Sequence, residues 1–144
     1  MKELRKSSHT VFSMKVHIVW ITKYRYGVLG GEVGLRIRDL IRQDCDALDV
    51  RIISGVVSKD HIHLFLSYPP KISISELVRQ LKGRSSRKIQ EDFPELRKKY
   101  WGRHFWAIGY GAFSSGNVTD EMIEEYIAHH SEDPYHGDHF KVVT

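Results

Sequence analysis

The sequence has one cysteine and lacks any long hydrophobic run. Cys45 therefore has no partner within the chain, which excludes an internal disulfide and fits the reducing cytoplasm, where we expect the protein to be located. No apolar run approaches the length of a membrane span, and the charged start Met1–Lys6 is unlike a signal peptide, so we expect no membrane association. A length of 144 residues, 41% of them hydrophobic, suits one globular domain with an adequate core.

Positive charge is concentrated in the middle of the chain, although the net charge is only +4. Residues 71–103 contain ten Lys and Arg against four Asp and Glu, a net charge of +6. Residues 117–144 contain one Lys against seven Asp and Glu, a net charge of −6. A basic middle of this kind is typical of proteins that bind a polyanion, but a solvated helix face explains it equally well.

Two histidines, His61 and His63, stand two residues apart in a run that has the pattern of a strand. Alternate residues of a strand face the same way, so both imidazoles are expected on one face and Ile62 and Leu64 on the other. Imidazole is the commonest metal-binding side chain near neutral pH, so the pair could form half of a metal site. Ordinary packing or surface chemistry is the alternative interpretation of the same pattern.

Hydrophobic periodicity and turn residues predict seven elements in the order β-α-β-β-α-β-α. We expect strands over 9–22, 50–58, 61–68 and 104–114, and helices over 32–48, from the Ser73 capping box to before Pro94, and over 120–130. This order predicts an α+β protein with a ferredoxin-like (RRM-like) β-α-β-β-α-β antiparallel sheet, two helices on one face and an additional C-terminal helix. Residues 1–131 are expected to form the single domain, and 132–144 a loose C-terminal tail.

The last predicted helix contains Tyr126 and His130, which lie on one helical face because they are four residues apart. If this helix covers the sheet face that contains His61 and His63, His130 could be a third metal ligand with Tyr126 beside it. Three ligands with open positions are typical of a catalytic metal site. Tyr126 also lies on an apolar stripe, so a structural tyrosine in the core is the competing interpretation.

Four stretches of the sequence, taken together in chain order, resemble a known family. Their combination is more specific than any one of them alone. They are HIVWITKYR at 17–25, DHIHL at 60–64, LKGRSSR at 81–87 and EYIAHH at 125–130. Over roughly residues 11–130 the sequence resembles the HUH-type single-tyrosine transposases of small prokaryotic insertion sequences.

The resemblance implies a role for each residue of the candidate site. His61 and His63 would be the metal ligands, with His130 at the third-ligand position and Mg²⁺ or Mn²⁺ as the cofactor. Tyr126 would be the nucleophile, on the additional helix. The resemblance further implies a homodimer with joined sheets that cleaves and rejoins single-stranded DNA beside hairpins at the element ends, through a 5′-phosphotyrosine intermediate.

The basic residues near these motifs are the candidates for contacts with DNA phosphates. They are Lys23, Arg25, Arg79, Lys82, Arg84 and Arg87. Tyr24 and Tyr26 could stack on bases, whereas packing is the expected role of Trp106. The pair Arg25-Tyr26 departs from the Arg-Arg that commonly ends this motif in the family, which puts one basic contact in doubt.

Three other functions share parts of this pattern, and the domesticated relative is the hardest of them to exclude from the sequence. Replication initiators and relaxases share the chemistry but usually have extra domains. A domesticated nuclease that processes genomic repeats would share all of these residues, and only terminal hairpins flanking the gene would separate the two. A non-catalytic ferredoxin-like module that binds nucleic acid needs neither Tyr126 nor the histidine pair.

Overall fold

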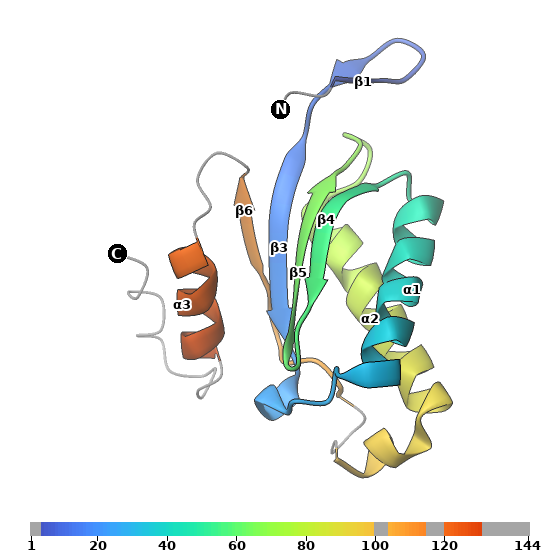
Figure 1. Ribbon diagram of the computed structural model, residues 1–144. Helices are drawn as coiled ribbons and strands as arrows, with labels where there is room; N and C mark the ends of the chain where they lie inside the picture. Colours follow the sequence, from blue (N-terminus) through green and yellow to red (C-terminus); the bar gives the residue numbers. More distant parts are fainter. Residues whose placement is uncertain (1–3, 100–103, 115–119, 131–144) are drawn as a thin grey trace.

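A four-stranded antiparallel sheet forms the centre of the protein in the computed structural model, which describes residues 4–99, 104–114 and 120–130 (Figure 1). The predicted loose tail therefore lies outside the described residues. The strands are β1 (Arg5–Lys6), β2 (Val11–Phe12), β3 (Lys15–Ile21), β4 (Arg51–Val57), β5 (His61–Ser67) and β6 (Gly111–Ser114). The α-helices are α1 (Gly31–Ala47), α2 (Ile74–Asp92) and α3 (Asp120–His130), with 3₁₀ turns η1 (Lys23–Arg25) and η2 (Pro94–Lys99).

The sheet has the strand order β4-β5-β3-β6, and every neighbouring pair is antiparallel. Helices α1 and α2 cover one face, while α3 lies over the other (Figure 1). In chain order the strands of this sheet are β3, β4, β5 and β6, so its first strand, β3, lies between its third, β5, and its fourth, β6. This is the strand order of the ferredoxin-like arrangement. The predicted fold class is confirmed, including the extra helix at the C-terminal end. No helix in the described ranges is long and apolar enough to cross a membrane.

Alternation along β3 and β5 produces the main hydrophobic core. Ile18, Trp20, Ile62, Leu64 and Leu66 are buried and belong to the cluster that packs against α1 and α2. Each such side chain contributes roughly 1.5–3 kcal/mol by leaving water. The opposite face of the same strands is thereby left for the odd-numbered residues, which include both histidines.

Local signals fix the two ends of α2. Ser73 is the N-cap, and its hydroxyl accepts a 3.1 Å hydrogen bond from the backbone N–H of Glu76, as the capping box predicts. The helix ends at Asp92, two residues before Pro94, because proline cannot continue the backbone hydrogen-bond pattern.

The predicted strand over 104–114 is wrong in its first half. Only Gly111–Ser114 pairs with β3, and before it Trp106 makes a single isolated bridge to Thr22. The Lys82 ammonium donates 2.8 Å hydrogen bonds to the carbonyl oxygens of Ala107 and Gly109. The carbonyls that a strand would use for pairing are therefore bound to a helix side chain instead.

Arg5 attaches the short β1–β2 hairpin to the rest of the fold. Its guanidinium is buried and donates to the carbonyl oxygen of Ser67 at 3.0 Å and to the carbonyl oxygen of Asp49 at 2.9 Å. It also pairs with the Asp49 carboxylate at 3.0 Å. A buried cation is tolerated here because oxygen atoms surround it.

Candidate functional site

His61 and His63 lie on the sheet face opposite α1 and α2, as their spacing predicts. In the antiparallel register, His61 is opposite Ile21 and His63 is opposite Val19. Both side chains are partly exposed, whereas Ile62 between them is fully buried on the other face. The strand therefore holds two imidazoles side by side on a rigid backbone.

Helix α3 packs on this same face, which was the condition for the predicted site. Val19 and Ile21 form a second hydrophobic cluster with Ile123 and Ile127 of α3, and Tyr126 packs against it. Because Val19 and Ile21 are the cross-strand partners of the two histidines, Tyr126 lies on the same face of the sheet as the histidine pair. Burial raises the pKa of the Tyr126 phenol above its ordinary value.

The Asp60 carboxylate orients His61. Asp60 Oδ1 lies 2.9 Å from His61 Nδ1, and Asp60 Oδ2 accepts a 3.0 Å hydrogen bond from Arg25 Nε. Burial alone would raise the pKa of Asp60, but the hydrogen bonds from His61 and Arg25 outweigh it and lower that pKa. With Nδ1 directed at Asp60, the Nε2 atom of His61 is the nitrogen left for a ligand.

His63 has a different neighbour, His17 of β3. His63 Nε2 and His17 Nδ1 are 3.0 Å apart, and the His17 ring stacks on Phe65 with centroids 4.1 Å apart. Burial lowers the pKa of His17, which favours its neutral form. The contact between His17 and His63 was not predicted, since the cross-strand register that brings the two residues together is not visible in a sequence.

The turn Thr22–Tyr26 lies at the end of β3 beside the β4–β5 hairpin. The Lys23 ammonium lies 5.3 Å from the centre of the Tyr24 ring, and Tyr24 and Tyr26 are 57% and 40% exposed. Their ring centroids are 5.2 Å apart, so two aromatic surfaces face solvent next to Lys23 and Arg25. Trp106 differs from them, because it is buried and donates its indole N–H to Ser85 Oγ at 3.0 Å.

The four predicted DNA contacts on α2 are not equivalent. Arg79 is largely exposed and pairs with Glu76 in the preceding turn, and Arg87 is exposed. Arg84 connects α2 to α1 through Asp44 Oδ1 at 2.7 Å, with a further hydrogen bond to Gln43. The Lys82 ammonium already donates hydrogen bonds to two backbone carbonyl oxygens, and burial lowers the pKa of Lys82 to about 8.

The remaining predicted ligand, His130, belongs to α3, but its side chain lies outside the described residues. Among the side chains that are described, no group of three His, Cys, Asp or Glu has the arrangement of a metal site. The structure thus brings together His61, His63 and Tyr126 on one face of the sheet and leaves the third ligand position undescribed.

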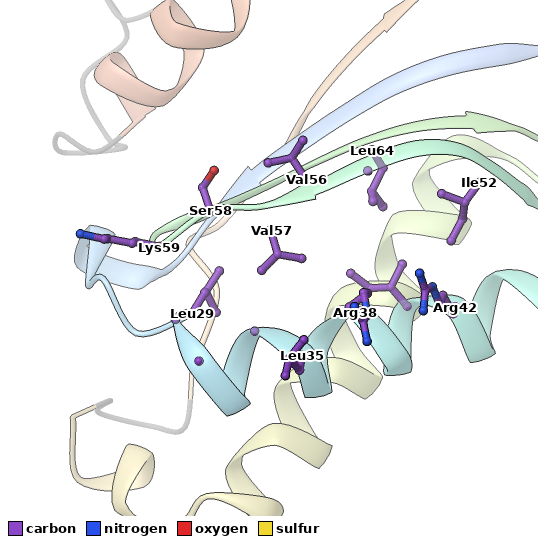
Figure 2. A pocket seen from close by; sticks show the side chains of 15 residues that line it. Leu29, Leu35, Arg38, Arg42, Ile52, Val56, Val57, Ser58, Lys59 and Leu64 are labelled. Carbon is purple, nitrogen blue, oxygen red and sulfur yellow. The ribbon is translucent and has the colours of Figure 1, made fainter.

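A hollow of about 630 Å³ lies elsewhere, between α1 and the edge strand β4 (Figure 2). Its lining combines Leu29, Val57 and Leu64 with Arg38 and Arg42. Because α1 covers the sheet face opposite α3, this hollow is separate from the histidine pair.

Comparison of the sequence with known proteins gives one consistent result. Residues 10–130 match the family model for IS200-like transposases. The transposase for insertion sequence element IS200 of Salmonella typhimurium is 35% identical over 142 residues, which cover 99% of this chain and 93% of that protein. The ISDra2 transposase TnpA of Deinococcus radiodurans is 34% identical over 125 residues, which cover 87% of this chain and 89% of that protein.

Solved structures support the same fold. The crystal structure of a Deinococcus radiodurans protein named as a transposase superposes with a TM-score of 0.79 at 29% identity, covering 88% of this chain and 97% of that one. A REP-associated tyrosine transposase bound to a REP hairpin has a TM-score of 0.55 at 16% identity, covering 88% of this chain and 70% of that one. From its sequence, and in agreement with this fold, the chain belongs to the family of IS200-like transposases.

Proposed function

We propose that this transposase cleaves and rejoins single-stranded DNA through a covalent bond between Tyr126 and a 5′-phosphate. One observation carries the proposal: α3 packs on the cluster that contains Val19 and Ile21, the direct cross-strand partners of His63 and His61, and Tyr126 packs against this cluster. A phenol and two imidazoles on one face of a sheet provide a nucleophile and metal-binding groups for phosphoryl transfer.

The reaction consists of two exchanges at phosphorus. The Tyr126 oxygen attacks phosphorus in line and its proton passes to water. The bond between phosphorus and the 3′-oxygen of the preceding nucleotide breaks, and this oxygen takes a proton from water and leaves as a hydroxyl. The phosphotyrosine bond conserves the phosphodiester energy, so a second 3′-hydroxyl can reverse the step and join a different strand without ATP. The phenol is a weak nucleophile, since its ordinary pKa is about 10 and burial of Tyr126 raises it further.

A divalent cation, Mg²⁺ or Mn²⁺, would supply polarisation of the scissile phosphate and neutralise developing negative charge. His61 fits a ligand role, because its hydrogen bond to Asp60 occupies Nδ1 and leaves Nε2 for the ion. His63 would bind through its Nδ1, or through Nε2 in exchange for the contact with His17. His130 is proposed as the third ligand from its place four residues after Tyr126 on α3.

Single-stranded DNA would be held by the turn Thr22–Tyr26 and by the exposed cations of α2. Lys23 and Arg25 would bind phosphates, while Tyr24 and Tyr26 would stack on bases. On α2, Arg79 and Arg87 are the more exposed candidates. Lys82 and Arg84 also remain proposed contacts, although each already binds groups of this chain.

Hairpin recognition and dimerisation complete the proposal. The structurally similar REP-associated transposase is bound to a REP hairpin, and we extend hairpin-marked ends to this chain as its substrate. The predicted homodimer with joined sheets is supported by β4, a seven-residue edge strand with exposed Ile53 and Val56. An edge strand of this kind can pair with a second copy through its backbone groups.

The test is a covalent-adduct gel with labelled single-stranded DNA that contains the element's own end, with and without Mn²⁺. Wild type should form a metal-dependent protein–DNA band, and Tyr126→Phe should lose this band while hairpin binding stays within about twofold, because only the phenol oxygen is removed. Tyr68→Phe is the matched control, since Tyr68 packs against the core on the other side of the sheet. Strand cleavage by Tyr126→Phe at the wild-type rate would refute the assignment of Tyr126 as the nucleophile.

His61→Ala tests the metal separately. We expect it to lose cleavage and metal dependence together, while the fold is retained because His61 is partly exposed. A His61→Ala protein that still needs Mn²⁺ and cleaves normally would remove His61 from the ligand set.

A further inference from the structure

Asp60 uses both oxygens of one carboxylate, and they bind two different functional groups. Oδ1 accepts from His61 Nδ1 at 2.9 Å, and Oδ2 accepts from Arg25 Nε at 3.0 Å. The side chains of Asp60 and His61 are about one-fifth exposed, at 19% and 22%, and that of Arg25 is 38% exposed. The carboxylate thus lies between a proposed metal ligand and a proposed phosphate contact.

The backbone holds this turn in place independently of the carboxylate. The Thr22 N–H donates to the Asp60 carbonyl oxygen at 2.9 Å, and the Thr22 hydroxyl donates to the Tyr26 carbonyl oxygen at 2.8 Å. The Leu29 N–H donates to the Lys59 carbonyl oxygen at 2.9 Å. Removal of the Asp60 carboxylate therefore leaves the hydrogen bonds that join the turn to the hairpin.

Resting on the metal-assisted function proposed above, we propose that Asp60 is a positioning residue that couples metal binding at His61 to phosphate binding at Arg25. A neutral imidazole has one N–H and one lone pair. When Asp60 accepts the Nδ1 proton, the lone pair is fixed on Nε2 and the ring is held in one orientation, which is how carboxylates commonly support metal-binding histidines.

The other half of the coupling is at Arg25. Its Nε is bound to Asp60, and among the described residues no side chain accepts from its terminal Nη groups, which can form a forked pair with a phosphate. A phosphate bound there restrains Arg25, and Arg25 in turn restrains the carboxylate that orients His61. Coupling between two binding sites is reciprocal, so DNA must then raise metal affinity by the same factor as metal raises DNA affinity.

The measurement is Mn²⁺ binding by calorimetry and by electron paramagnetic resonance, first without DNA. Asp60→Ala should weaken Mn²⁺ binding by about 10- to 100-fold, the usual loss when the carboxylate behind a ligating histidine is removed. Asp60→Asn should show a smaller loss, because its amide oxygen can still accept from Nδ1. Asp92→Ala is the matched control: it removes another partly exposed carboxylate that pairs with an arginine, Arg36 at 2.6 Å, and should leave Mn²⁺ binding unchanged.

The second measurement repeats the titration with saturating single-stranded DNA. Wild type should bind Mn²⁺ at least about threefold more tightly with DNA than without it, and in Arg25→Gln this ratio should fall to about one, with the DNA-free affinity of each protein as its own reference. A carboxylate with only a structural role would lower the melting temperature without changing the Mn²⁺ dissociation constant.

The outcomes separate this inference from the proposed function. Equal Mn²⁺ affinity in wild type and Asp60→Ala would overturn the positioning role and leave the metal site standing. A DNA-induced gain that persists in Arg25→Gln would overturn the coupling. Wild type that binds no Mn²⁺ under any condition would overturn the metal-assisted function and this inference together.

Discussion

Gly83 is an exposed glycine inside α2, and its replacement by alanine should stabilise the protein. A glycine within a helix costs about 0.5–1 kcal/mol relative to alanine, because the unfolded chain loses more conformational freedom on folding. A Cβ atom built at Gly83 has no neighbouring atom within 4 Å, so no steric cost opposes this gain. We expect Gly83→Ala to raise the free energy of unfolding by about 0.5–1 kcal/mol and the melting temperature by roughly 1–4 °C.

The matched control is Gly111→Ala in β6. A Cβ atom there would lie 2.9 Å from Val19 Cγ1 and 2.9 Å from Phe113 Cε2, within the cluster on which α3 rests. We expect this variant to lose about 1–3 kcal/mol, the usual cost of overpacking a well-packed site. Urea unfolding followed by circular dichroism measures both variants. Destabilisation by Gly83→Ala, or full stability of Gly111→Ala, would refute the reasoning from local space.

The same variant tests the DNA-binding role of α2. Gly83 lines two shallow hollows, one with Arg87 and Arg97 and the other with Arg79 and Arg84. A missing side chain between arginines lets a DNA backbone approach the helix closely, so Gly83→Ala should bind single-stranded DNA more weakly even though it is more stable. Unchanged DNA affinity, measured by fluorescence anisotropy at fixed salt, would count against contacts at this surface.

Three further predictions concern Lys82, Ser73 and Tyr126. Burial lowers the pKa of Lys82 from 10.5 to about 8 on folding, so between these pH values the unfolded chain binds more protons than the folded one. The free energy of unfolding should therefore rise with pH, by up to about 3 kcal/mol. In urea titrations from pH 7.5 to 10 this rise should be absent in Lys82→Met, and an identical pH profile in both proteins would refute the assignment. Ser73→Ala removes the N-cap side chain of α2 and should lower the free energy of unfolding by about 1 kcal/mol in the same assay, whereas Ser73→Asp should keep the stability of the wild type. Burial raises the pKa of Tyr126, so single-turnover DNA cleavage should accelerate by up to about tenfold per pH unit between roughly pH 6.5 and 8.5, and a rate independent of pH would exclude phenolate attack as the limiting step.

Short-range patterns predicted those parts of the fold that depend on neighbouring residues. The alternation around His61, Ile62 and His63 gave the face of each side chain, and the spacing of Ser73 and Glu76 gave the start of α2. These predictions succeeded because the strand period and the helix cap are properties of a few adjacent residues.

The failures involve partners that are distant in the chain. The aromatic residues Phe105 and Trp106 have the composition of a strand, but they are buried in the core, and the carbonyls after them bind Lys82 rather than a neighbouring strand. Burial and strand pairing select the same residue types, so composition cannot separate them. The contact of His17 with His63 depends on cross-strand register in the same way.

The candidate site shows the same division. The histidine pair and the tyrosine helix were both predicted from the sequence, but which face of the sheet that helix covers could not be. The structure supplies this face through the packing of α3 on Val19 and Ile21. No role was predicted for Asp60 beyond its place at the start of the motif at 60–64, because that role depends on where Arg25 lies after β3 has ended.

The order of the elements along the chain has a consequence for protein synthesis. The histidine pair is translated early, and α3 with Tyr126 follows β6 as the most C-terminal of the described helices. Translation begins at the N-terminus, so the sheet strands and the two helices that cover their other face are synthesised before the nucleophile. Under the proposed chemistry, a nascent or truncated chain that ends before residue 126 keeps the histidine pair and the proposed DNA contacts, but it lacks both Tyr126 and His130 and cannot form a covalent adduct. Premature termination would then produce an inert competitor for the element's ends rather than an uncontrolled nuclease.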